Sequence, residues 1–205
     1  MVGHQVLVLI IGVRVPVPQP IFMKITFITG NIGKVNEVSR YLGIAAEHQK
    51  LDLEEIQSLD IEEIVKDKAT RAFEKVGGPV LVEDVSLVFH ALGKLPGPLI
   101  KWFLSQLNNE GLCKLVDGKD RNCTATVCYG YHDGKAIHLF SGAMSGSVVS
   151  SPKGNNSFGW ASIFMPDGYD KTYAELSDAE QAPISMRNIA LAKLRRFLVA
   201  DSGGK

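Results

Sequence analysis

The chain has 205 residues, of which 45% are hydrophobic and 21% are charged, and its 22 basic residues balance its 22 acidic ones. This length supplies one sizeable hydrophobic core, and the zero net charge excludes a broad basic surface that binds nucleic acid by charge alone. Three cysteines without a C-x-x-C spacing exclude a disulfide framework and indicate a reducing compartment, so we expect a cytoplasmic protein.

The first 22 residues differ from the rest of the chain. The stretch QVLVLIIGVRVPVPQP is too short to span a bilayer, and it lacks the basic start and the cleavage site of a signal peptide. We therefore expect residues 1–22 to be a dispensable extension, with a targeting segment as the alternative. We expect residues 23–200 to form one two-lobed domain without a membrane segment, and residues 201–205 to form a tail.

A candidate anion site follows the first predicted strand. Apolar residues over 24–29 stop at the turn Thr29-Gly30-Asn31, and a helix is predicted over 34–42 because apolar residues recur on one face. Such a turn exposes backbone N–H groups at the positive end of a helix, and its glycine lets a ligand approach closely. Lys34 could reach over the same site. The pattern is neither a Walker A loop nor G-x-G-x-x-G.

A second helix is well marked in the sequence. We expect Asp60 to be its N-cap, with Glu63 completing a capping box, and Gly77-Gly78-Pro79 to end it. At 100° per residue, Lys68 falls inside the apolar stripe of this helix. An inward lysine must extend to water, pair with an acid or bind a ligand, and the helix pattern leaves these alternatives open.

Two acidic pairs suggest phosphate chemistry. The stretch PVLVEDVSLVF predicts a short strand that ends at Glu83-Asp84, where ligand crevices of α/β sheets usually lie, and Glu54-Glu55 occupies a loop before the second helix. Carboxylates without neighbouring His or Cys suit Mg²⁺, and Lys34, Lys68 and Lys101 would oppose the charge of a polyphosphate. This combination favours metal-assisted phosphate chemistry over zinc chemistry, with solvated loop acids as the alternative.

The later part of the chain predicts a different arrangement. Pro98 suits the first turn of a helix, and two strands are expected on either side of a turn at Asp133-Gly134. A terminal helix is expected from about Met186. Because strands and helices alternate early and a hairpin follows late, we expect an α/β fold with a mixed sheet and helices packed on it.

The motifs TGNIGK, PVLVEDVSLVF, ALGKLPGPLIKWF, FGWASIFMPDGYDKTYAEL and ISMR together resemble the inosine triphosphate pyrophosphatase (Ham1-like) family, and the eukaryotic branch most closely. The resemblance runs from about Met23 to Leu198. It implies a long central mixed β-sheet with flanking helices and two lobes around a cleft. It also implies a homodimer that needs Mg²⁺, with Mn²⁺ as a substitute. Such enzymes hydrolyse ITP, dITP and XTP to the monophosphate and pyrophosphate, which cleanses the nucleotide pool.

The resemblance also implies roles for individual residues. Asp84, Glu83 and Lys34 would be catalytic, and Glu55 and Asp84 would bind the metal. The substrate-binding residues that it implies are Thr29, Gly30, Asn31, Lys34, Lys68, Lys101, Phe158, Gly159, Trp160, Ser185 and Arg187.

Three residues depart from the family pattern in the segment that reads the base. Ala161 follows F-G-W where the family usually has Asp, Met186 replaces the His of S-H-R, and Gln181 stands where Lys is common. A site that loses polar partners loses discrimination between substrates. Two alternatives therefore stay open: the same chemistry with altered or relaxed base specificity, and a nucleotide-binding pseudoenzyme.

Overall fold

The computed structural model describes residues 24–155 and 159–202 of the chain. The predicted extension at 1–22 and the predicted substrate-binding residue Phe158 therefore lie outside the described residues. Within these ranges the strands are β1 (Thr26–Ile28), β2 (Glu47–Gln49), β3 (Val80–Phe89), β4 (Pro96–Gly97), β5 (Asn122–His132), β6 (Ile137–Val148) and β7 (Phe164–Pro166). The α-helices are α1 (Ile32–Leu42), α2 (Ile61–Val76), α3 (Ile100–Lys114), α4 (Asp178–Gln181) and α5 (Met186–Ser202), and a 3-10 helix covers His90–Leu92.

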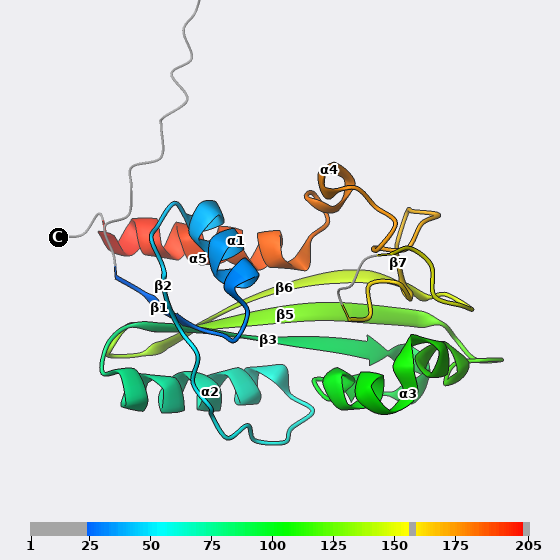
Figure 1. Ribbon diagram of the computed structural model, residues 1–205, viewed down its shortest axis with the longest axis horizontal. Helices are drawn as coiled ribbons and strands as arrows, with labels where there is room; N and C mark the ends of the chain where they lie inside the picture. Colours follow the sequence, from blue (N-terminus) through cyan, green and yellow to red (C-terminus); the bar gives the residue numbers. More distant parts are fainter. Residues whose placement is uncertain (1–23, 156–158, 203–205) are drawn as a thin grey trace, which may run out of the picture.

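The described strands form one seven-stranded sheet in the order β2-β1-β3-β5-β6-β7, with β4 paired to β3. β1 runs parallel to β2 and β3, whereas β3, β5, β6 and β7 are joined as antiparallel neighbours. Figure 1 shows α1 and α5 over one face of the sheet and α2 and α3 over the other. The prediction of an α/β fold with a long central mixed sheet and flanking helices is confirmed.

The hairpin of β5 and β6 forms the longest part of the sheet, and its turn lies where the sequence predicts it. Gly134 has a φ of 98°, a left-handed conformation that favours glycine. The side chain of Asp133 accepts hydrogen bonds of 2.7 Å from the backbone N–H groups of Lys135 and Ala136. The turn therefore follows from local sequence, as expected for a D-G hairpin.

The strand β3 corrects one prediction. Glu83 and Asp84 lie in its middle, so the prediction of a strand that ends there was wrong. On one edge, β5 pairs with β3 from Val80 to Phe89. On the other edge, β1 pairs with residues 80–81 and β4 with residues 87–88. Among the described strands, none covers that edge between these two pairings, so a ligand can reach the middle of β3 as it would reach a strand end.

The helix starts confirm some predictions and correct others. Asn31 and Asp60 are N-caps, and the Asp60 carboxylate accepts a backbone N–H of the first turn at 2.8 Å. However, Glu63 accepts the hydroxyl of Ser58 at 2.7 Å, so the predicted capping box was wrong. The prediction of Pro98 in the first turn of a helix was also wrong, because α3 begins two residues later.

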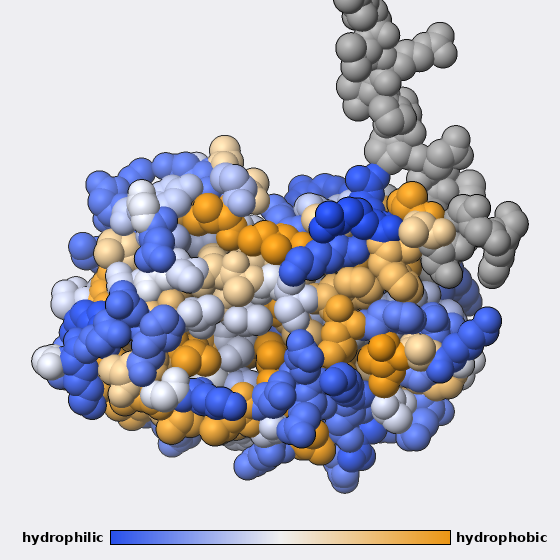
Figure 2. Space-filling model, turned by 180° about the vertical axis from the view of Figure 1, so that it is seen from behind, coloured by the Kyte–Doolittle hydropathy of each residue, from blue (hydrophilic) through white to orange (hydrophobic). Residues whose placement is uncertain are grey.

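The surface carries apolar side chains in separate areas. On the face seen from behind, hydrophilic side chains border several smaller apolar areas (Figure 2). Ile56 and Trp102 are among the described large apolar residues that are more than a third exposed, and both line the cleft described below. No helix within the described ranges has the length and apolar character needed to cross a membrane.

Candidate active site

A cleft of about 820 Å³ lies at the open edge of β3. Its walls come from the end of β1, the start of α1, the loop before α2, α2 itself, the middle of β3, the start of α3 and the segment at Trp160. Ten of the predicted site residues line it: Thr29, Gly30, Asn31, Lys34, Glu55, Lys68, Glu83, Asp84, Lys101 and Trp160.

The turn after β1 is held in the shape that an anion site needs. The Asn31 side chain accepts the N–H of Gly33 at 2.9 Å, and the N–H of Asn31 donates to the Thr29 hydroxyl at 3.1 Å. The Thr29 carbonyl oxygen lies 2.7 Å from the His48 Nε2, so β2 supports the turn from outside. These bonds keep the positive end of α1 directed at the cleft.

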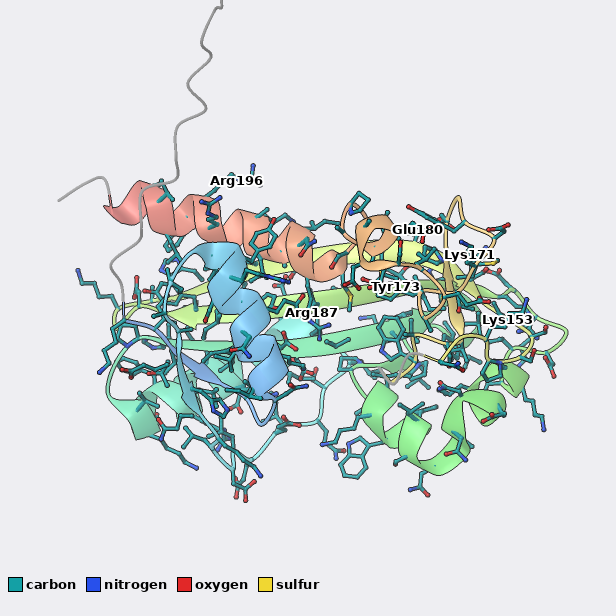
Figure 3. All side chains as sticks on the ribbon, turned by 45° about the horizontal axis from the view of Figure 1, so that its top comes forward. Lys153, Lys171, Tyr173, Glu180, Arg187 and Arg196 are labelled. Atoms are coloured by element: carbon teal, nitrogen blue, oxygen red, sulfur yellow. The ribbon has the colours of Figure 1, made fainter. Side chains whose placement is uncertain are left out.

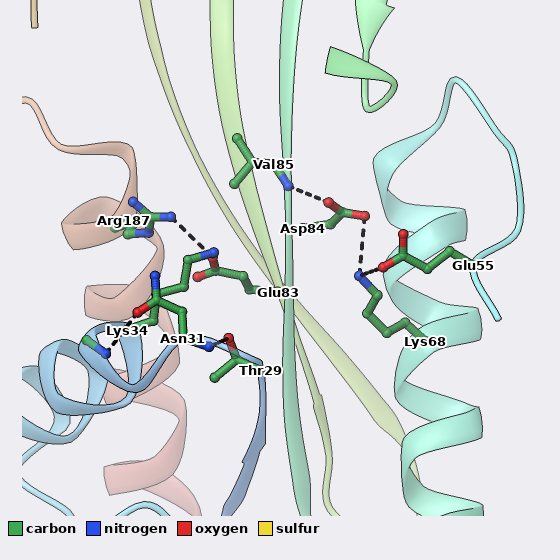
Figure 4. Close-up of polar contacts among 10 residues, drawn as sticks. Thr29, Asn31, Lys34, Glu55, Lys68, Glu83, Asp84, Val85 and Arg187 are labelled. Carbon is green, nitrogen blue, oxygen red and sulfur yellow. Dashed lines mark hydrogen bonds and ion pairs between the residues drawn. The ribbon is translucent and has the colours of Figure 1, made fainter. Parts of the chain in front are cut away.

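Glu83 faces α1 and α5. Its Oε1 accepts from the Lys34 Nζ at 2.5 Å and from the Arg187 Nη2 at 3.2 Å, and its side chain is only 5% exposed (Figure 4). Burial alone would raise the pKa of Glu83, but the charges of Arg187 and Lys34 outweigh it and lower the pKa. Glu83 is therefore a buried anion that depends on two cations.

Asp84 faces the opposite side of the sheet, toward α2. Its Oδ1 accepts the N–H of Val85 at 2.8 Å, and its Oδ2 lies 3.6 Å from the Lys68 Nζ (Figure 4). Lys68 also pairs with Glu55 at 2.6 Å. Burial raises the pKa of Asp84, the reverse of the shift at Glu83. Lys68 therefore pairs with acids, one of the three alternatives that its helix pattern left open.

Glu83 and Asp84 line one cleft although successive side chains of a strand point to opposite faces. Glu83 and Asp84 belong to different faces of the sheet, and a ligand at a covered part of the strand could reach only one of them. At the open edge of β3 both line the same cleft. The site thus has two clusters of charge, with Lys34 on one side of the sheet and Lys68 on the other.

A divalent cation fits the chemistry of Glu55 and Asp84. Carboxylate oxygens from both residues already approach one positive charge, that of the Lys68 ammonium. Among the described residues, no group of three or more His, Cys, Asp or Glu side chains is gathered in a metal-binding arrangement. Two carboxylates suit Mg²⁺ bound together with substrate phosphates and water, rather than Mg²⁺ held by a complete protein cage.

Only some of the remaining predicted substrate-binding residues line the cleft. Lys101 and Trp160 line the cleft, whereas Ser185, Arg187 and Gly159 are not among its described lining residues. Ser185 accepts the N–H of Asn188 at 3.3 Å in the first turn of α5. Arg187 extends from α5 beside α1 (Figure 3), and its contact with Glu83 places it behind that carboxylate.

The three residues that depart from the family pattern pack or form hydrogen bonds away from the cleft. The Gln181 amide donates to two backbone carbonyl oxygens, at 2.8 and 3.0 Å. Ala161 and Met186 are buried, and none of the three is among the described residues that line the cleft. The three departures therefore do not alter the residues that line the cleft around the turn at Asn31.

Three further residues border the site without a prediction from the sequence. Tyr129 is buried and lies directly opposite Glu83 in the pairing of β3 with β5. Trp102 lines the cleft with 60% of its surface exposed, and the Lys101 Nζ lies 5.9 Å from its ring centre. The third is His48, whose Nε2 contacts the carbonyl oxygen of Thr29 from β2. An aromatic residue on an exposed helix position was the only available signal, and it applied to Trp102.

Comparisons with known proteins identify the family of the chain. The sequence matches the Ham1 family over residues 25–197, which is most of the chain. The chain belongs to the Ham1 family. A Schizosaccharomyces pombe relative named inosine triphosphate pyrophosphatase is 44% identical over 186 residues, which span 88% of this chain and 98% of that protein.

Solved Ham1 structures share the fold. A HAM1 protein from Coxiella burnetii matches with a TM-score of 0.78 and 23% identity over 87% of this chain and 99% of that one. A nucleoside-triphosphatase, titled also dITP/XTP pyrophosphatase, from Mycobacterium abscessus matches with a TM-score of 0.70 and 26% identity. That match covers 84% of this chain and 98% of the other.

Proposed function

We propose that this Ham1 protein hydrolyses ITP, dITP and XTP to the nucleoside monophosphate and pyrophosphate, and so removes these purine nucleotides from the nucleotide pool. The observation that carries the proposal is the cleft that gathers the turn at Asn31, three lysines and the carboxylates of Glu55, Glu83 and Asp84. The names of full-length relatives at 44% identity support the choice of substrate over relaxed specificity or a pseudoenzyme.

The turn and the lysines would bind the triphosphate. Backbone N–H groups at the start of α1 would face phosphate oxygens, and Lys34 and Lys68 would contribute charge from either side of the sheet. Because each lysine is paired with acids, each must exchange a carboxylate for a phosphate oxygen. The interactions with phosphate gain strength as negative charge develops on the leaving pyrophosphate.

Asp84 is the better candidate for orienting the attacking water. Glu83 is buried and holds two cations, whereas the side chain of Asp84 is 23% exposed and has a raised pKa, which makes it the stronger base. The water oxygen would attack the α-phosphorus while the bond between that phosphorus and the bridging oxygen breaks. The proton would pass by way of Asp84 to solvent, and pyrophosphate would leave.

Glu55 and Asp84 would hold Mg²⁺, with Mn²⁺ as a substitute. When bound, the metal would supply positive charge that neutralises phosphate oxygens and weakens the bond to the leaving group. We also propose a cytoplasmic homodimer. The three cysteines are free and buried, which supports a reducing compartment. The dimer stays a prediction from the family resemblance, which light scattering of the purified chain would test.

Pyrophosphate release tests the proposal. The purified chain is incubated with Mg²⁺ and ITP, dITP, XTP, ATP or GTP, and pyrophosphate is measured. Much faster release from the first three substrates is expected. Equal release from all five would indicate relaxed specificity, and binding without release would indicate a pseudoenzyme, so either outcome would contradict the proposal.

A further inference from the structure

Lys68 lies between the two residues that are predicted to bind the metal. Its Nζ lies 2.6 Å from Glu55 Oε1 and 3.6 Å from Asp84 Oδ2, so its ammonium already bridges both predicted metal ligands (Figure 4). We propose that Lys68 competes with the divalent cation for these two carboxylates, so that the cation binds tightly only after a triphosphate has drawn the ammonium away. This inference rests on the proposed function.

The competition follows from charge and space. The Lys68 ammonium neutralises one of the two carboxylate charges and lies at the oxygens that a metal would use, and its side chain is only 14% exposed. A divalent cation at the same oxygens would meet the positive charge of the ammonium within a few ångströms, and solvent screens such a repulsion poorly at a partly buried site. The cation can therefore bind well only if the ammonium leaves.

The ammonium has a place to go and the means to reach it. Lys68 lines the same cleft as the turn at Asn31, where the phosphates would bind. A lysine carries its charge on a flexible four-carbon chain, so it can move between acceptors while α2 stays in place. Phosphate oxygens are strong acceptors for an ammonium and would replace the carboxylates that it gives up.

The other cleft lysine provides a matched comparison. Lys34 also pairs with an acid in the cleft, but its partner is Glu83 on the opposite face of β3. Among the described residues, the salt bridges of Glu55 and Asp84 both go to Lys68. If Lys68 acts only as a general source of positive charge, the two lysines should influence metal affinity alike.

Direct metal binding in the absence of nucleotide tests the inference. Free Mn²⁺ is measured by electron paramagnetic resonance during titration of the unmodified chain, Lys68→Met and Lys34→Met. We expect Lys68→Met to bind Mn²⁺ roughly tenfold or more tightly than the unmodified chain, a modest change for one removed charge at this distance. Lys34→Met should bind Mn²⁺ within about twofold of the unmodified chain, because it leaves both ligands and their ammonium in place.

Equal or weaker Mn²⁺ binding by Lys68→Met would overturn the inference. Lys68→Gln, which keeps a polar group in the cleft, is titrated in parallel, and urea unfolding confirms that each variant is folded. Pyrophosphate release by the unmodified chain is measured separately. If the unmodified chain releases no pyrophosphate but Lys68→Met binds Mn²⁺ more tightly, the proposed function alone is refuted. If the unmodified chain releases pyrophosphate but Lys68→Met shows no gain in Mn²⁺ affinity, this inference alone is refuted.

Discussion

Removing the charge of Glu83 should lower the free energy of unfolding strongly, whereas removing the charge of the neighbouring Asp84 should not. Glu83→Gln leaves two cations, Lys34 and Arg187, around a neutral amide in a buried place. Removing one partner of a buried ion pair costs about 3–5 kcal/mol. The side chain of Glu83 is only 5% exposed, but Lys34 can turn toward the water of the cleft, which favours the lower end of this range. We therefore expect Glu83→Gln to lower the free energy of unfolding by about 3 kcal/mol at pH 7.

Asp84→Asn should be tolerated. The amide oxygen can still accept the N–H of Val85, and Lys68 keeps its contact with Glu55 at 2.6 Å. Burial raises the pKa of Asp84, so the fold already opposes its negative charge. We expect the free energy of unfolding to change by less than about 1 kcal/mol or to rise, as is common when a charged functional group is removed from a partly buried site.

Urea unfolding in metal-free buffer measures both effects, and pH adds a second check. The pKa of Glu83 is lowered in the fold, so its contribution is complete above the ordinary glutamate pKa of about 4.3 and is lost as the pH falls through the folded value. The difference between the unmodified chain and Glu83→Gln should therefore narrow below about pH 4. Equal losses for both variants, or a difference that stays constant with pH, would refute the reasoning.

Three further variants test the site by kinetics. Asp84→Asn should lower pyrophosphate release by at least about 100-fold while the fold persists, and near-normal turnover would exclude Asp84 from the chemistry. Lys68→Met should mainly raise KM for ITP at saturating Mg²⁺, by about tenfold, and an unchanged KM and kcat would exclude a phosphate contact. Tyr129→Phe should raise KM severalfold, because Glu83 loses its interaction with the Tyr129 hydroxyl and holds Lys34 more firmly. Tyr131→Phe is its control on the same face of β5, and an equal rise in that variant would contradict this role.

Local sequence was sufficient for the parts of the site that depend on one element. The turn at Thr29-Gly30-Asn31 forms as predicted, because a glycine and an N-capping asparagine define the start of α1 without help from distant residues. The inward position of Lys68 also follows from the helical repeat alone. What the helix pattern could not supply was its partner, since Glu55 and Asp84 come from a loop and from another strand.

Strand pairing explains what the sequence could not predict. The two acids of β3 interrupt an apolar run, which locally indicates a strand end, yet the ladder with β5 continues through them. Whether such a position is accessible depends on where β1 and β4 stop along the other edge. The neighbour of Glu83 likewise depends on register, because a shift of one residue would turn Tyr129 to the opposite face.

A chain without net charge can hold a polyphosphate if its cations change partners. In the cleft, Lys34 and Lys68 are compensated by acids, so the site presents little unbalanced positive charge to other anions. Each lysine gives up a carboxylate when it binds phosphate, so the gain in binding free energy is smaller than the number of phosphate contacts suggests. On one side, Arg187 remains to hold Glu83, which keeps that buried anion compensated. On the other side no such second cation contacts Asp84 among the described residues, and this is where a divalent metal would restore the balance of charge.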